Sequence, residues 1–132
     1  SRQHFLKLQL PDTYKKLLEA GITDDYSMGF ADQVGFRAGI CSTFNFFDLH
    51  ADKTTTLKVH PFAIMDGTLN QYMKLNIEEA KNITSQIINE IKSVNGTFIS
   101  LWHNETLSET GIWKGWRSVF EYTLQCIHTT EK

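Results

Sequence analysis

Residues 76–102 read NIEEAKNITSQIINEIKSVNGTFISLW and contain the clearest helix of the chain, followed by a short strand. Asn76 is a good helix N-cap, and Glu79 three residues later completes a capping box. Apolar side chains then recur every three or four residues as far as Val94, after which an Asn-Gly pair supplies a stop signal. This spacing predicts an amphipathic helix from Asn76 to about Val94 with one buried face.

The residues after this helix predict a strand and a second helix. Thr97–Trp102 is rich in β-forming residues and is long enough for a buried strand. A second apolar face follows at helical spacing, formed by Trp113, Trp116, Phe120, Leu124 and Ile127. Residues 77–126 therefore predict the order helix, strand, helix.

The first half of the chain repeats this alternation more weakly. Pro11–Ala20 predicts a helix that Gly21 ends, and strands are predicted on either side of it, at Ser1–Leu6 and Ile22–Met28. Three further strands are predicted downstream: Phe44–Leu49 and Thr56–Val59, which can pair as a hairpin, and Phe62–Met65.

Alternating strands and helices predict an α/β fold, with a parallel sheet and right-handed crossovers, as part of a barrel or as an open layer. About four parallel strands leave apolar edges exposed, and a barrel of eight βα units needs about 250 residues. We therefore expect residues 1–132 to form a single domain that is a portion of a larger one, or a protomer of a homo-oligomer joined at the sheet edge.

Composition excludes several classes of function. The chain has 132 residues, is 41% hydrophobic and 21% charged, and has a net charge of -2 with no basic run, which argues against nucleic acid as a partner. No apolar stretch is long enough for a membrane span, and Ser1–Leu10 lacks the pattern of a signal peptide, which favours a cytoplasmic location. Cys41 and Cys126 show no metal-ligand spacing and are predicted to be reduced thiols.

Candidate functional residues follow from the architecture, because reactive groups in α/β folds gather just after the carboxyl ends of strands. Arg37 is added because it lies in a loop flanked by small residues, where it could bind a carboxylate. Each candidate also has a possible structural role: His103 as a hydrogen-bonded histidine, Asp66 as a turn residue, and Arg37 as a member of a surface ion pair. The strand ends select His4, Asp24, Asp25, Tyr26, Asp66, His103 and Asn104.

Two motifs carry a family resemblance. Gly35–Gly39 (GFRAG) and, much later, Leu101–Asn104 (LWHN) resemble the later motifs of the polysaccharide deacetylase (NodB-like) family, in the family's order. Ser1–Leu6, Asp25–Gly29 and Pro61–Leu69 resemble stretches in the C-terminal half of that catalytic domain in a bacterial branch. The resemblance covers nearly the whole chain and implies part of a (β/α)-barrel.

The resemblance also implies a mechanism, in which a divalent metal, commonly zinc, activates water to hydrolyse an N- or O-acetyl group of a carbohydrate. His103 falls on the catalytic acid, Asp66 on the residue that orients it, and Arg37 on the clamp for an upstream base. Asp25 and His4 are second choices on the same rim. The residues expected to contact the sugar are Trp102, Asn104, Tyr26 and His4.

The sequence departs from that family at the metal. No His-x-x-x-His occurs, and Arg37 lacks the Pro-Tyr of the usual motif, so the metal ligands are expected upstream of Ser1 and the chain alone is expected to be inactive. Two alternatives stay open. One is a non-catalytic carbohydrate-binding or assembly module on the same scaffold, and the other is an unrelated α/β dimer in which the LWHN motif is coincidental.

Overall fold

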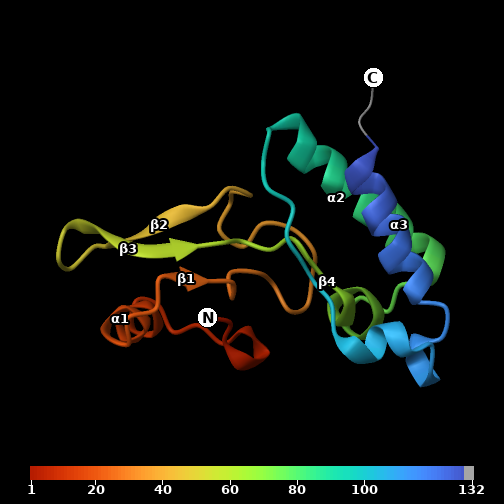
Figure 1. The fold of residues 1–132 in the computed structure, drawn as a ribbon, viewed down its shortest axis with the longest axis horizontal. Coiled ribbons are helices and arrows are strands. Elements are labelled where there is room, and N and C mark those ends of the chain that lie inside the picture. The colour runs from red at the N-terminus through yellow and green to blue at the C-terminus, as the bar shows by residue number, and fades with distance from the viewer. Residues whose placement is uncertain (130–132) are drawn as a thin grey trace.

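In the computed structural model, which describes residues 1–129, the first half of the chain forms a three-stranded sheet covered by one helix (Figure 1). Strands β2 (Phe44–Asp48) and β3 (Lys53–Val59) form the predicted antiparallel hairpin, whereas β1 (Asp24–Asp25) pairs parallel with β3. Tyr14 of the helix is buried with Leu57 and Val59 of β3 in an apolar cluster. The elements are α1 (Asp12–Glu19), β1 (Asp24–Asp25), β2 (Phe44–Asp48) and β3 (Lys53–Val59).

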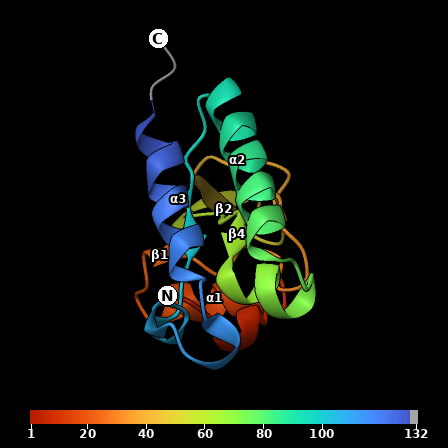
Figure 2. The ribbon, with the colours of Figure 1, turned by 90° about the vertical axis from the view of Figure 1, so that its right-hand side faces the viewer.

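The second half places two helices beside a two-stranded parallel sheet. The helices lie side by side and run in the same direction, as the views in Figure 1 and Figure 2 show. Near their C-terminal ends, Lys92 Nζ donates 2.7 Å hydrogen bonds to the carbonyl oxygens of Cys126 and Thr129. The elements are β4 (Ile64–Met65), α2 (Ile77–Ser93), β5 (Ser100–Leu101) and α3 (Arg117–His128).

Helix α2 confirms the strongest local prediction. Asn76 Oδ1 accepts a hydrogen bond from the Glu79 N–H, and Glu79 Oε2 accepts one from the Asn76 N–H, both at 2.9 Å. At the other end Asn95 adopts a left-handed conformation (φ 51°), and the Gly96 N–H donates to Ile91 O at 2.9 Å. The inward face packs on α3 and β4 in the largest apolar cluster, with Ala80, Ile87, Ile91, Val119 and Ile64 among its buried members.

One predicted strand is absent, and three others are at least twice as long as the observed strands. Ser1–Leu6 is wrong as a strand, because Leu6 N donates back to Gln3 O at 3.0 Å and closes a 3-10 turn over His4–Leu6. Only two residues of each of three predicted strands form a strand: Ile22–Met28 contains β1, Phe62–Met65 contains β4 and Thr97–Trp102 contains β5. Their other backbone groups bond to several different segments rather than to one neighbouring strand, so no longer ladder forms.

The second helix also starts later than its apolar spacing predicts. Gly115 has a φ of +84°, which breaks the helical path, and Trp113 lies instead in a 3-10 turn, Gly111–Trp113. Leu124 and Ile127 are about 40% exposed, so the buried stripe of α3 is narrower than predicted. Trp113 remains buried, in the same apolar cluster as Ala80, Ile87 and Val119.

The mixed α/β class is confirmed, whereas the barrel is not. Within residues 1–129 the strands form two short sheets, one of them mixed, and no closed barrel. No helix in this range is long and apolar enough to cross a membrane. The organisation of residues 1–132 as a portion of a larger domain, and the cytoplasmic location, stay predictions.

Candidate functional site

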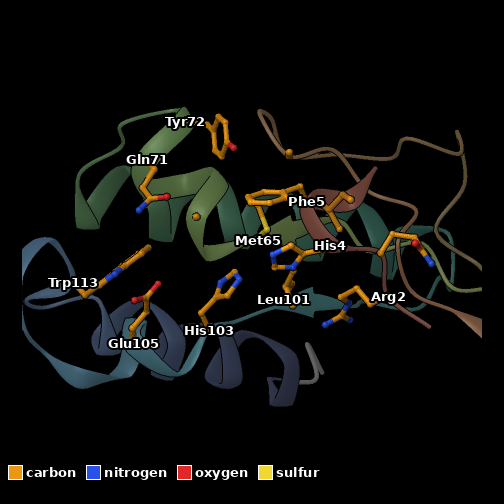
Figure 3. A pocket seen from close by; sticks show the side chains of 14 residues that line it. Arg2, His4, Phe5, Met65, Gln71, Tyr72, Leu101, His103, Glu105 and Trp113 are labelled. Atoms are coloured by element: carbon orange, nitrogen blue, oxygen red, sulfur yellow. The ribbon is translucent and has the colours of Figure 1, made fainter. Parts of the chain in front are cut away.

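A pocket of about 360 Å³ opens where β4 and β5 end (Figure 3). Because these strands are parallel neighbours, their carboxyl ends lead to the same edge, as expected for α/β folds. Met65, Gly67, Leu101 and His103 come from these strand ends. The remaining walls are the segment Arg2–Leu6, Ala31, and Gln71, Tyr72, Glu105 and Trp113 from three short turns.

Asp66 is the buried anchor of this site. Its side chain is fully buried, and its carboxylate accepts hydrogen bonds from the Gly67 N–H and the His103 N–H, both at 2.6 Å, and from Thr106 Oγ1. A buried charge is tolerated only when such donors surround it. The carboxylate therefore ties the end of β4 to the loop after β5 and keeps that loop in place.

His103 is oriented by the same carboxylate. Its Nδ1 lies 2.7 Å from Asp66 Oδ1, while its side chain is 51% exposed and lines the pocket. A carboxylate at Nδ1 favours a proton on that nitrogen, which leaves the lone pair of Nε2 available on the pocket side. The pair is thus arranged so that His103 can take up or release a proton while Asp66 stays in place.

His4 and Phe5 form the wall opposite, on the 3-10 turn His4–Leu6. Their rings meet edge to face, with centroids 4.5 Å apart. The turn is attached to the segment after β1 through Gln3, whose N–H donates to Ser27 Oγ at 2.7 Å. His4, which the sequence singled out, therefore lines the pocket together with His103, whose imidazole is held by the buried Asp66 (Figure 3).

Arg37 and Asp25 lie behind this wall and do not line this pocket. Arg37 Nη1 donates to the carbonyl oxygens of Leu6 (3.3 Å) and Gly29 (3.2 Å), so its guanidinium binds main chain rather than a carboxylate. Asp25 is fully buried and accepts from the N–H (3.0 Å) and hydroxyl (2.9 Å) of Ser27. Burial, and then the nearby Asp25 carboxylate, raise the pKa of the Tyr14 hydroxyl.

The other three candidates point elsewhere. Trp102 Nε1 donates to Ser100 Oγ at 3.1 Å, and its ring meets Phe120 of α3 edge to face, with centroids 5.2 Å apart. Asn104 is exposed outside the pocket lining. Tyr26 stacks on His60 in a surface cluster, with centroids 4.4 Å apart.

That surface cluster has its own electrostatics. His60 Nε2 lies 2.7 Å from Asp24 Oδ1, and Nδ1 lies 2.9 Å from Thr43 Oγ1. The hydrogen bond from His60, followed by the one from Thr23, lowers the pKa of the Asp24 carboxyl. Asp24 therefore holds an exposed edge of the sheet together, away from the pocket.

Sequence reasoning missed the aromatic walls. Phe5, Tyr72 and Trp113 all line the pocket, yet Trp113 was predicted to be a helix core residue and the other two carried no motif. The only available signal was that Phe5 adjoins His4. The polar residues Gln71 and Glu105 also carried no sequence signal for a site, because the turns on which they lie become neighbours only in the fold.

The comparisons with known proteins give one match. A family model described as an FAD-binding domain matches residues 41–120, a range that contains both Asp66 and His103. No curated protein and no solved structure matches the chain.

This match overturns the resemblance stated above. The assignment to the polysaccharide deacetylases, with the hydrolase activity and its carbohydrate alternative, is wrong, because the matched family is an FAD-binding domain. The expected zinc or other divalent metal is corrected to a flavin; within residues 1–129 no three His, Cys, Asp or Glu side chains lie close enough to hold a metal ion. The motifs misled because polar residues at strand ends recur in many unrelated α/β folds. Neither a carbohydrate partner nor an oligomer gains support.

The pocket fits the ring end of FAD. Its volume of about 360 Å³ lies at the lower end of pockets for drug-sized ligands, about 300–1,000 Å³. Aromatic faces of Phe5, Tyr72 and Trp113 border it, and Gln71 and Glu105 supply hydrogen-bonding groups. These are the two features that a flat, polar-edged ring such as isoalloxazine requires.

The diphosphate of FAD finds no comparable place at the helix N-termini of the matched range, where phosphates commonly bind. The N-terminus of α2 is closed by its own capping box. In front of α3, the Glu109 carboxylate accepts hydrogen bonds from the N–H groups of Gly115 (2.8 Å) and Arg117 (2.9 Å). These bonds lower the pKa of Glu109, so a fixed negative charge already occupies the position.

Proposed function

Because this chain belongs to the family of FAD-binding domains, we propose that its pocket binds the isoalloxazine ring of a flavin and that His103 moves a proton at that site. The observation that carries the proposal is the buried Asp66 carboxylate, which holds His103 at the pocket edge. A bound flavin supplies hydride and electron transfer, chemistry that the side chains of the protein lack.

The aromatic residues provide the ring-binding surface. Phe5 and Tyr72 are exposed and Trp113 is buried, so the pocket offers both open faces and a packed apolar wall. Aromatic rings stack in offset or edge-to-face arrangements that are stronger than their buried area alone implies. Gln71 and Glu105 lie near Trp113 and can exchange hydrogen bonds with a polar ring edge (Figure 3).

His103 provides the proton transfer. With Nδ1 directed to Asp66, its Nε2 can accept a proton from the pocket, and the buried carboxylate then stabilises the imidazolium. Asp66 accepts hydrogen bonds from the N–H groups of Gly67 and His103 and from the Thr106 hydroxyl, so its carboxylate stays fixed beside the imidazole. The exposed half of the imidazole lets the proton pass on to water.

The test uses riboflavin, which carries the ring without the diphosphate. Wild-type protein is expected to quench riboflavin fluorescence on titration, and the spectrum of the bound ring is expected to change with pH. His103→Gln should still bind riboflavin but should lose this pH dependence. His50→Gln, in the exposed turn between β2 and β3, is the matched control and should behave as the wild type.

Two results would count against the proposal. Failure of the wild type to bind riboflavin or FAD contradicts flavin binding. Binding with the same pH dependence in the wild type and in His103→Gln contradicts the proton transfer while leaving the ring site intact.

A further inference from the structure

We infer that Phe5 is a stacking platform for the planar ring of the ligand and that Arg37 is the positioning residue that holds this platform over the pocket. The inference rests on the proposed function, because it names the residues by which the same pocket recognises its ligand. It starts from a strained backbone segment that forms a wall of the pocket.

The strain lies in two consecutive residues. Phe5 and Leu6 have φ values of 55° and 54°, a left-handed conformation that bulky side chains rarely adopt. Such residues persist only where surrounding contacts impose the conformation, and they occur frequently at ligand clamps. The segment Arg2–Leu6 is a wall of the pocket, which is the location expected for a clamp.

The strained turn separates two apolar side chains. Leu6 is 7% exposed and packs with Phe62 and Met65, whereas Phe5, its neighbour, is 75% exposed at the pocket. His4 meets the Phe5 ring edge to face, which supports the ring from one side. A large aromatic side chain held in the open beside a pocket is placed to bury its face against a ligand rather than against the core.

Arg37 secures the C-terminal end of the turn. Its Nη1 donates both to Leu6 O and to Gly29 O, and so joins the turn to the segment after β1. That segment is itself immobilised, because Gly29 lies so close to Phe62 that a Cβ there would come within 2.2 Å of the ring. The guanidinium therefore holds the Leu6 carbonyl, and with it the end of the turn, in a fixed position relative to Gly29.

The N-terminal end of the turn is held by a second chain of hydrogen bonds. The Gln3 N–H donates to Ser27 Oγ at 2.7 Å, and Ser27 Oγ donates to the buried Asp25 at 2.9 Å. Because hydrogen bonds hold both ends of the turn, they maintain the left-handed backbone conformation of Phe5. This arrangement gives Arg37 and Asp25, which do not touch the pocket, a role in shaping it.

The experiment measures riboflavin binding by fluorescence quenching together with the visible circular dichroism of the bound ring, which reports stacking. Phe5→Ala is expected to weaken binding about tenfold and to abolish the dichroic signal, whereas Phe5→Trp restores both. Phe47→Ala, which removes an exposed phenylalanine from β2, is the control and should match the wild type. Thermal melts of each variant show whether it is folded.

Arg37 is tested through Phe5. Arg37→Met should weaken binding and reduce the dichroic signal, and Arg37→Lys, which keeps a donor, should recover part of both. Because Arg37 acts through the platform, the double variant Phe5→Ala/Arg37→Met should bind no more weakly than Phe5→Ala alone.

The outcomes separate the two proposals. If the wild type binds riboflavin and Phe5→Ala binds equally well with an unchanged signal, the platform is excluded and the proposed function stands. If Arg37→Met leaves the signal unchanged, or if the two substitutions add in full, the positioning role is excluded. If the wild type binds no flavin, the proposed function fails and the platform with it.

Discussion

Asp66 and Glu109 show how single carboxylates organise the loops of this molecule. Asp66 is buried and binds three residues on two loops, so it positions His103. Glu109 is on the surface with a left-handed backbone (φ 60°), and it closes the start of α3. Both act by accepting main-chain N–H groups that would otherwise lack partners.

Glu109→Gln should lower the free energy of unfolding relative to the wild type at neutral pH, and this loss should be smaller at acid pH. The hydrogen bonds from Gly115 and Arg117 lower the pKa of Glu109 in the fold below its ordinary value of 4.5. A lowered pKa contributes stability that is present above 4.5 and is lost as the pH falls through the folded value. Urea unfolding should therefore show a difference in the free energy of unfolding between the wild type and Glu109→Gln at about pH 7, and a smaller difference at about pH 3.

The control for this experiment is Glu90→Gln, on the exposed side of α2. It should change stability little at either pH. An equal loss for Glu109→Gln at both pH values would show that its carboxylate charge contributes nothing to the closure of α3.

Among the elements, α2 depends most on local signals. Its capping box, its apolar stripe and its left-handed stop are all adjacent in sequence, which is why the helix was predicted within about a residue at each end. The strands are the opposite case. β1, β4 and β5 have two residues each, and their partners are distant in sequence, so no local pattern marks where pairing ends.

Asn76→Ala tests the contribution of the cap. Removing the side chain that accepts the Glu79 N–H should lower the free energy of unfolding by about 1 kcal/mol, measured by urea denaturation. Asn82→Ala, at an exposed position inside the same helix, is the matched control and should be neutral or slightly stabilising, because alanine is the better helix former. Equal effects of the two substitutions would show that the cap is unimportant here.

Gly29→Ala tests the contact between the segment after β1 and the start of the second half. A Cβ at Gly29 would lie 2.2 Å from the buried ring of Phe62, so the substitution should destabilise the protein by about 1–3 kcal/mol. Gly67→Ala is the control, since its added Cβ has no neighbour closer than 3.7 Å. Thermal unfolding of the two variants compares the sites directly; a Gly29→Ala protein as stable as the wild type would contradict the close packing.

The pocket and the N-termini of α2 and α3 together indicate which part of the cofactor the molecule recognises. The pocket accepts a ring, while the starts of α2 and α3 are occupied by the chain's own Asn76, Glu79 and Glu109. Riboflavin and FAD should therefore bind with dissociation constants within about tenfold of each other, and ADP should not displace riboflavin. Isothermal titration measures both. Much tighter binding of FAD, or displacement by ADP, would show that the diphosphate is bound after all.

Local signals along the chain predict the α/β class, helices α1 and α2, the β2–β3 hairpin, and the strand-end positions of Asp66 and His103. These depend on caps, turns and periodicity within a few residues, or on the general rule that parallel strands end at one edge. Three features are visible only in the fold: Asp66 binds His103, Arg37 binds main chain, and Phe5, Tyr72 and Trp113 border one pocket. The contacts of His103 with Asp66 and of Arg37 with Leu6 join residues more than 30 positions apart in sequence, so no local pattern specifies their geometry, which exists only in the folded chain.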